Sequence, residues 1–221
     1  MTKRKQPQKI RKTASRIIGW GKYCIFRVKQ STRLGADIRR INLCGGQIHI
    51  PGYLNIDIGH SADLPVDLSK RNLPFDDESI EVVVCMSAIN YFTYTRAAEI
   101  IREVHRVLQR GGIARFGVQD LETIAARYLN KDREFFFQKL PDGRDRFEGP
   151  TIGDKFAAWF YGYESGGSTC KYFFDFDSLA FLFHKAGFVI VEKSAFQSSR
   201  ISGVTQIDNR SEQMFFLEAV K

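Results

Sequence analysis

The sequence predicts an α/β protein whose seven strands form a doubly wound sheet, and three features of the 221-residue chain support this. Short apolar runs alternate with stretches of helical spacing from residue 38 onward, which is typical of strands joined by helical crossovers. Residues 81–86 (EVVVCM) are almost continuously apolar, as in a central parallel strand buried on both faces. Two glycines follow the first apolar run and a carboxylate ends the second.

The elements follow one another in a regular order. Strands are expected at residues 39–43, 54–58, 64–68, 81–86, 113–118, 188–196 and 213–221. A helix should follow the fourth strand, because residues 97, 100, 101, 104 and 108 are apolar and share one helical face. Gly111 stands where its C-cap would lie. Further helices are predicted at residues 121–129, after an Asp120 N-cap, and at 176–186, before Gly187.

Charge divides the chain into a basic arm and an acidic domain. Residues 1–33 contain eleven of the 33 Lys and Arg residues and no Asp or Glu, so residues 34–221 carry 22 basic and 25 acidic side chains, a net charge of −3. We therefore predict an N-terminal arm at 1–33 and a single domain at 34–221. The domain lacks the positive charge that nucleic-acid binding requires, so no nucleic-acid partner is expected for it.

The arm is amphipathic at helical spacing. Its apolar residues include Ile10, Ile17 and Ile25, and Trp20 adds an aromatic anchor among the basic side chains. Such a segment can lie in the interface of an anionic membrane. A helix packed on the domain, a partly disordered leader, and an arm that binds nucleic acid or another partner are the alternatives. The four cysteines are scattered without paired spacing, which favours a reducing cytoplasm and predicts neither a disulfide framework nor a metal site.

Residues 131–171 interrupt the alternation of strands and helices. The segment is long, rich in aromatic residues and glycine, and follows the fifth strand. Ligands of such sheets bind beyond the carboxyl ends of the strands, so we expect this insert to form a lid over an acceptor. Its aromatic residues could line that acceptor site, and packing in a core explains most of them equally well.

The glycine pair and the acid suggest a ligand. Glycine allows the backbone to approach a ligand closely, and Asp57 at the tip of the second strand can accept hydrogen bonds from both ribose hydroxyls. The turn has no complete G-x-G-x-x-G pattern, and residues 44–55 are too few for an ordinary crossover helix. A pyrophosphate normally needs the N-terminus of such a helix. We therefore expect a nucleoside without phosphate, with S-adenosylmethionine (SAM) as the main candidate.

Several ordered blocks resemble one family. They are residues 41–46 (INLCGG), 51–57 (PGYLNID), 66–84 (VDLSKRNLPFDDESIEVVV), 102–129 (REVHRVLQRGGIARFGVQDLETIAARYL) and 174–188 (FDFDSLAFLFHKAGF). Together they resemble the class I SAM-dependent methyltransferases, and within them a small bacterial group from surface-glycan and secondary-metabolite clusters. The resemblance implies a mostly parallel, seven-stranded Rossmann-like sheet with an antiparallel last strand, and SAM as the cofactor.

The resemblance also implies roles for individual residues. Cys44, Gly45 and Gly46 would contact the methionine part of SAM, and Asp57 would bind the ribose. Asp67 and Leu68 would contact adenine, while Met86 and Ser87 would face the sulfonium and the acceptor. Asp57 and Asp67 could instead be turn residues. Two departures stand out: Cys44 replaces the first glycine of the turn, and residues 87–92 (SAINYF) contain no histidine.

Methyl transfer to an oxygen needs positioning and removal of a proton. Asp120, at the tip of the fifth strand, is the candidate base, with a helix N-cap as its alternative role, and Ser87 is the second candidate catalytic residue. The resemblance points to O-methylation of a sugar or another small or lipid-linked hydroxyl. A methyltransferase acting on a membrane lipid and a SAM-binding module without catalysis are the alternatives. The protein is expected in the cytoplasm, with the arm able to bring it to the membrane.

Overall fold

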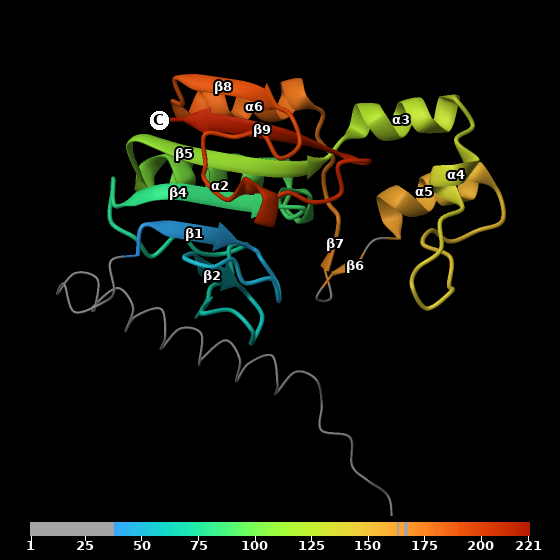
Figure 1. Ribbon diagram of the computed structural model, residues 1–221, viewed down its shortest axis with the longest axis horizontal. Helices are drawn as coiled ribbons and strands as arrows, with labels where there is room; N and C mark the ends of the chain where they lie inside the picture. Colours follow the sequence, from blue (N-terminus) through green and yellow to red (C-terminus); the bar gives the residue numbers. More distant parts are fainter. Residues whose placement is uncertain (1–37, 163, 166–167) are drawn as a thin grey trace, which may run out of the picture.

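The computed structural model describes residues 38–162, 164–165 and 168–221. The predicted basic arm at 1–33 lies outside the described residues, and so does the interfacial helix proposed for it. Tyr163, one of the aromatic residues of the insert, also lies outside them. Figure 1 shows the described part as one sheet with a helical insert at one of its edges.

Seven strands form the sheet, in the order β3-β2-β1-β4-β5-β9-β8. Every neighbouring pair is parallel except those of β9, which runs antiparallel to both β5 and β8. This confirms the predicted mostly parallel sheet with an antiparallel last strand. The strands are β1 (Arg40–Leu43), β2 (Leu54–Asp57), β3 (Leu64–Pro65), β4 (Ile80–Met86), β5 (Leu108–Gln119), β8 (Ile190–Ser194) and β9 (Met214–Val220).

The order of the strands reverses between β1 and β4, which lie side by side at the centre of the sheet. Their connections leave in opposite directions at this switch point, which is where sheets of this kind bind ligands, beyond the carboxyl ends of the strands. The interior of both strands is buried. The topology therefore makes the tips of β1 and β4 the expected place for a ligand.

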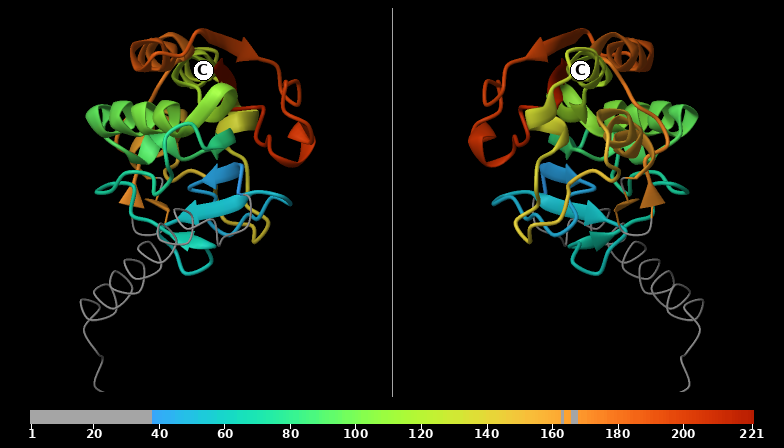
Figure 2. Two further views of the ribbon diagram at one scale, coloured as in Figure 1. Left: turned by 90° about the vertical axis from the view of Figure 1, so that its left-hand side faces the viewer. Right: turned by 90° about the vertical axis from the view of Figure 1, so that its right-hand side faces the viewer.

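One face of the sheet is covered by two helices, α2 (Tyr94–Val107) and α6 (Phe176–Ala186), which pack side by side. Val83 and Cys85 of β4 point into this main core, together with Phe116 of β5. Val82 and Val84 point the other way, as strand alternation requires. Among the described residues, this second face carries no α-helix and is covered by loops and one short 3₁₀ helix (Figure 2).

The cover of the second face comes mainly from residues 195–209, the cover segment, which includes the short 3₁₀ helix η2 (Val204–Gln206). Its Ile201 and Ile207 pack on Val82 and Val84 of the sheet. The segment joins β8 to β9, so it closes the sheet immediately before the last strand. The sequence pattern predicts only a connection here, between the strands expected at 188–196 and 213–221.

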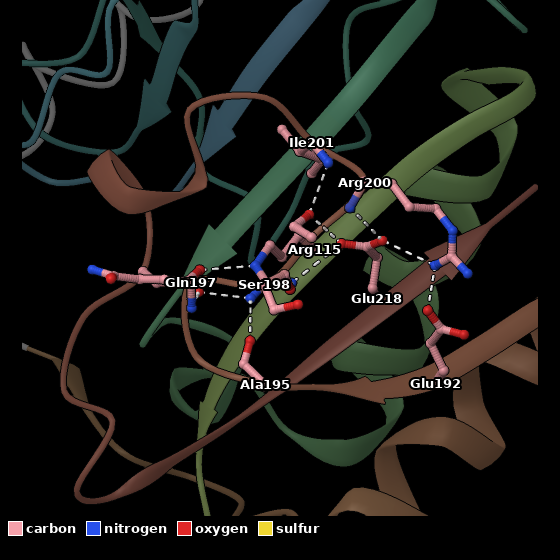
Figure 3. Close-up of polar contacts among 10 residues, drawn as sticks. Arg115, Glu192, Ala195, Gln197, Ser198, Arg200, Ile201 and Glu218 are labelled. Atoms are coloured by element: carbon pink, nitrogen blue, oxygen red, sulfur yellow. Dashed lines mark hydrogen bonds and ion pairs between the residues drawn. The ribbon is translucent and has the colours of Figure 1, made fainter.

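A buried arginine holds the cover segment on the sheet (Figure 3). Arg115 of β5 is fully buried and donates to both carboxylate oxygens of Asp208, at 2.8 and 2.6 Å, and to Glu218 of β9 at 3.2 Å. It also donates to the carbonyl oxygens of Ala195 and Ser198. A buried charge is tolerated only when it is paired and hydrogen-bonded. This one guanidinium therefore connects two strands and the cover segment.

The boundary between α2 and β5 differs from the prediction. The helix ends at Val107 and β5 begins at once with Leu108, so Gly111 is not a helix C-cap. Leu108 pairs with Ile80, whereas Ile113 pairs with Val82, which leaves an irregular stretch between them. Gly111 lies there with φ of 76°, in the left-handed region that glycine adopts without steric cost.

The extents of some strands were also predicted too generously. β3 has two residues, because Asp67 and the residues after it turn away instead of pairing with β2. β2 ends at Asp57, whose carboxylate is used by the loops beside it. Local hydrogen bonds from aspartate compete with strand pairing in this way.

The insert at 131–171 has a core of its own. It follows α3 (Leu121–Leu129) and contains α4 (Arg133–Phe136), α5 (Ile152–Tyr161) and a hairpin of β6 (Glu164–Ser165) and β7 (Ser168–Thr169). Phe135, Phe136, Phe147 and Trp159 are buried against one another, so these rings serve packing. Figure 1 shows the insert beyond the arrowheads of β4 and β5, the edge at which a lid was predicted.

No helix among the described residues combines the length and the apolar character needed to cross a membrane. Within the same residues, no group of three or more His, Cys, Asp and Glu side chains is arranged to hold a metal ion.

Candidate functional site

The predicted site residues lie at the carboxyl edge of the sheet, because β1 to β5 are all parallel. Residues 44–46, the glycine turn, follow β1. Asp57 ends β2, and Asp67 and Leu68 follow β3. Met86 ends β4 with Ser87 directly after it, and Asp120 follows β5. The fold thus brings the tips of five consecutive parallel strands to one edge.

Two buried asparagines shape the glycine turn. Asn42 of β1 and Asn55 of β2 stand opposite each other in register, and the Nδ2 of Asn42 donates to the Oδ1 of Asn55 at 3.2 Å. Asn42 also donates to the carbonyl of Ile48, and Asn55 to the carbonyl of Gly46, both at 3.0 Å. The pair satisfies its own polar groups while fixing the path of the chain beyond β1.

The asparagine pair explains why glycine is needed at position 45. A Cβ atom there would lie 2.1 Å from the Nδ2 of Asn42 and 2.3 Å from the Oδ1 of Asn55. At Gly46, where φ is 59°, a Cβ atom would meet nothing within 4 Å, so open space lies beside this residue. The turn is therefore tight beneath Gly45 and accessible beside Gly46. Sequence reasoning missed both asparagines, although each is a polar residue within an apolar strand.

Asp57 joins the loops on either side of it. One carboxylate oxygen accepts from the backbone N–H of Gly46 at 2.9 Å and the other from that of Gly59 at 3.1 Å. These bonds leave further acceptor positions on the carboxylate, which has about four lone-pair sites in all. Asp57 is therefore a turn organiser and still has acceptor capacity for a ligand.

Cys44 and Ser87 occupy strained positions at the two central strand tips. Their φ angles are 54° and 55°, in the left-handed region that non-glycine residues seldom adopt. Residues held in this conformation cluster at functional sites. Cys44 thus takes, at a steric cost, the conformation that a glycine would adopt readily.

The thiols at this edge are neutral at ordinary pH. Burial raises the pKa of Cys44 well above its usual value, and the nearby Cys85 and Asp57 raise it further. Burial and then Asp57 raise the pKa of Cys85 to about 12. A protonated thiol is a poor nucleophile, so Cys44 contributes shape to the turn rather than reactivity.

The loop after β3 is held by local contacts. The Asp67 carboxylate accepts from the backbone N–H of Ser69 at 3.1 Å, from the Ser69 hydroxyl, and from Lys70 at 3.2 Å. Partial burial alone would raise the pKa of Asp67, but the bonds from Ser69 and Lys70 outweigh it and lower the pKa. The local-turn role considered for Asp67 is therefore present. A role in binding adenine stays a prediction.

The tip of β4 has a sulfur-rich environment. The hydroxyl of Ser87 lies 3.3 Å from the sulfur of Met214, and its backbone N–H donates to the carbonyl of Gly117 at 2.8 Å. A Cβ atom at Gly117 would come within 2.6 Å of the sulfur of Met86. Gly117 therefore makes room for Met86 at the tip of β4, and within the part of the chain that the structure describes the Ser87 hydroxyl has no stronger acceptor than the Met214 sulfur.

Asp120 is the N-cap of α3. It is buried, and its carboxylate accepts from the backbone N–H of Glu122 at 3.1 Å and from the hydroxyl of Thr123 at 2.7 Å. Both oxygens are thus engaged in capping, as the alternative interpretation stated. Its catalytic role stays a prediction. His105 of α2 has a packing role: its ring lies edge-on against Phe188, with ring centroids 5.0 Å apart, on the helical face of the sheet.

A buried asparagine that the sequence did not reveal lies just beyond β4. Asn90 belongs to the 3₁₀ helix η1 (Ile89–Tyr91), and its carbonyl accepts from the N–H groups of Lys171 and Tyr172. Its Nδ2 donates to the carbonyl of Tyr172 at 3.2 Å, whereas its Oδ1 is fully buried and has no hydrogen-bond partner among the described residues. Phe174 forms an isolated parallel β-bridge with Asp120. The end of the insert is thus tied to the tips of both β4 and β5.

The residues present fit SAM. The turn offers close backbone approach beside Gly46, the carboxylate of Asp57 lies next to it, and a further acid, Asp67, follows the neighbouring strand. No α-helix begins at the turn, so the edge lacks the N-terminal dipole that a pyrophosphate would use. These features suit a nucleoside that carries no phosphate.

Comparison with known proteins agrees with this chemistry. Residues 30–116 match a family model described as a methyltransferase domain. A SAM-dependent methyltransferase from Archaeoglobus fulgidus matches with a TM-score of 0.50 at 11% identity, over 90% of this chain and 94% of that chain, and shares its fold. No curated protein matches the sequence.

Two further solved structures match at lower TM-scores. A SAM-dependent methyltransferase from Mesorhizobium loti has a TM-score of 0.48 at 14% identity, over 84% of this chain and 92% of that one. One from Methanosarcina mazei has a TM-score of 0.46 at 18% identity, over 85% and 94%. The family match at residues 30–116 spans the glycine turn, Asp57, the loop after β3 and the tip of β4.

Proposed function

We propose that this chain, which carries a class I SAM-dependent methyltransferase domain, transfers a methyl group to a hydroxyl oxygen of a sugar or of another small or lipid-linked acceptor. The cofactor is SAM. The observation that best supports its placement is the contact between the Asp57 carboxylate and the Gly46 amide, which joins the tips of β1 and β2 beside open space.

We assign the cofactor site to the carboxyl edge. Cys44, Gly45 and Gly46 would line the methionine part, with Gly46 presenting open backbone. Asp57 would accept from the ribose hydroxyls, since its carboxylate has lone pairs to spare. The adenine would lie toward Asp67 and Leu68, and the methyl group toward Met86 and Ser87. This direction follows the strand order β3-β2-β1-β4.

When bound, SAM supplies a methyl group on a positively charged sulfur, which an oxygen nucleophile displaces in line. The chain's own task is to hold the acceptor oxygen opposite the sulfur and to remove its proton. We assign proton removal to Asp120 and orientation of the acceptor to Ser87. Asp120 would have to release part of its capping interaction with Thr123 to act as a base.

The insert would cover the acceptor. Its end is tied to Asn90 and Asp120 at the tips of β4 and β5, which favours a lid anchored at the reaction edge. The Oδ1 of Asn90 has no hydrogen-bond partner among the described residues, and it would accept from a second hydroxyl of a polyhydroxylated acceptor if movement of the insert exposed it. A buried polar atom without a partner is costly, which supports an interaction supplied by substrate.

Turnover tests this assignment. The purified chain is incubated with SAM and, separately, with methyl glycosides, a polyprenyl-phosphate-linked sugar, a phospholipid and simple phenols, and release of S-adenosylhomocysteine is measured. We expect release with a hydroxylated sugar acceptor, and a fall in kcat of about 10²-fold or more in Asp120→Asn, with unchanged SAM affinity. Asn still caps a helix well, so α3 should persist.

Asp175→Asn is the matched control, because Asp175 caps α6 in the same way through Ser178. Equal activity of Asp120→Asn and wild type would remove Asp120 from the mechanism. Tight SAM binding without release from any acceptor would favour the SAM-binding module instead.

The arm at 1–33 would attach the domain to an anionic membrane, which favours a lipid-linked acceptor. Eleven basic residues and no acidic ones support this. Each basic residue near an anionic membrane surface contributes about 1 kcal/mol to the free energy of binding. We expect the full chain to sediment with anionic vesicles, less so in high salt, and a chain lacking residues 1–33 to remain in the supernatant. If both chains sediment equally, or neither does, the arm is not an anchor.

A further inference from the structure

The loop after β3, residues 67–71, lies next to the Asp57 tip. Pro65 of β3 pairs with Asp57, and the N–H of Val66 donates to the Asp57 carbonyl at 2.8 Å. The glycine turn lies on the other side of Asp57, after β1. A nucleoside whose ribose is bound by Asp57 and whose sulfur end reaches the turn therefore directs its base toward this loop.

Arg96 of α2 holds the two ends of this loop. Its Nε donates to the carbonyl of Leu68 and its Nη2 to that of Arg71, each at 2.6 Å. Its Nη1 donates to Glu99 at 2.6 Å, which orients the guanidinium, and the side chain is only 17% exposed.

The position of Arg96 on its helix is itself unfavourable. It is the third residue of α2, and a cation near a helix N-terminus opposes the helix dipole. The three hydrogen bonds offset this cost. The backbone of Arg96 is therefore part of the helix, whereas its side chain stabilises the loop. Because α2 follows β4 directly through η1, the arginine also connects the β3 loop to the element that leaves the β4 tip.

We propose that Arg96 is a positioning residue that sets the preference of the cofactor site for adenine, by holding residues 67–71 so that Asp67 can accept from the exocyclic amine of the base. The proposal rests on the proposed function. Asp67 already accepts three hydrogen bonds from Ser69 and Lys70, which leaves about one of its four lone-pair sites for a ligand. Its direction then depends on the loop.

Two ligands that differ only in the base test the proposal. S-adenosylhomocysteine carries the exocyclic amine, whereas S-inosylhomocysteine carries a carbonyl oxygen there, which cannot donate to a carboxylate. Calorimetry gives the ratio of the two Kd values for each variant. We expect the wild type to prefer the adenine ligand by about tenfold or more, as for a hydrogen bond to a charged group.

In Arg96→Met this preference should fall to about threefold or less, because the loop no longer presents Asp67 in one direction. Arg96→Lys keeps the charge but not the forked donors, and should give an intermediate ratio. A general loss of stability would weaken both ligands alike and would not change the ratio.

Arg106→Met is the matched control. Arg106 donates from the same helix to the carbonyls of Leu73 and Phe75, farther along the same connection. We expect it to lower the melting temperature and keep the wild-type ratio. The proposal is overturned if Arg96→Met and Arg96→Lys both keep the ratio, or if Arg106→Met loses it equally. Wild type that binds neither ligand would instead overturn the proposed function itself.

Discussion

Replacing Asp57 with alanine is expected to weaken SAM binding by about 1.5–3 kcal/mol, or roughly 10- to 150-fold in Kd. The variant would lose the acceptor for the ribose hydroxyls. It would also release the amides of Gly46 and Gly59, which Asp57 holds at 2.9 and 3.1 Å. Calorimetric titration of SAM into wild type and variant measures the change.

Asp57→Asn separates these two contributions, since its amide oxygen can still accept from one backbone N–H. Glu81→Ala is the control. Glu81 lies in β4 toward the opposite edge of the sheet and pairs with the half-exposed Arg39, so SAM affinity should not change. Unaltered affinity in Asp57→Ala would contradict the placement of the cofactor at this edge.

Arg115→Met is expected to lower the free energy of unfolding by about 3–5 kcal/mol. The substitution leaves the carboxylates of Asp208 and Glu218 buried without their shared cation. It also removes donors from the carbonyls of Ala195 and Ser198, so the cover segment loses its attachment to the sheet. Urea unfolding followed by circular dichroism measures the loss.

Arg200→Met is the matched control. Arg200 also contacts Glu218, but its side chain is 43% exposed, and exposed ion pairs contribute about 1 kcal/mol or less. Simultaneous replacement of Arg115, Asp208 and Glu218 by apolar residues of similar size should recover much of the loss, because no charge then remains buried. If Arg115→Met is no less stable than Arg200→Met, the network does not hold the cover segment.

The sheet could be predicted because its evidence is local. The apolar run of β4 and the helical face of α2 are periodic patterns that report burial directly. The predicted end of α2 was wrong because that prediction also used only local evidence. Gly111 looks like a C-cap in the sequence, but pairing of Leu108 with Ile80 starts β5 before it. Pairing between distant segments overrides the local signal.

The candidate site was predicted only in part. Asp57 and the glycines could be singled out as candidates because strand tips and turns have recognisable residues. Asn42 and Asn55 were missed, because their meaning depends on standing opposite each other in neighbouring strands. Arg96 was missed as well, since a helical arginine looks solvent-exposed until its carbonyl partners at 68 and 71 are seen.

The sequence by itself determined the chain order of the seven sheet strands and of α2, α3 and α6, the glycine turn after β1 and the acid at the tip of β2, because hydrophobic periodicity and turn chemistry act over a few residues. Only the tertiary structure decided that residues 195–209 cover the second face of the sheet and that Arg115 holds them there. It also decided that the insert has its own aromatic core. These outcomes depend on contacts between residues as many as 103 positions apart, whose partners no local pattern specifies.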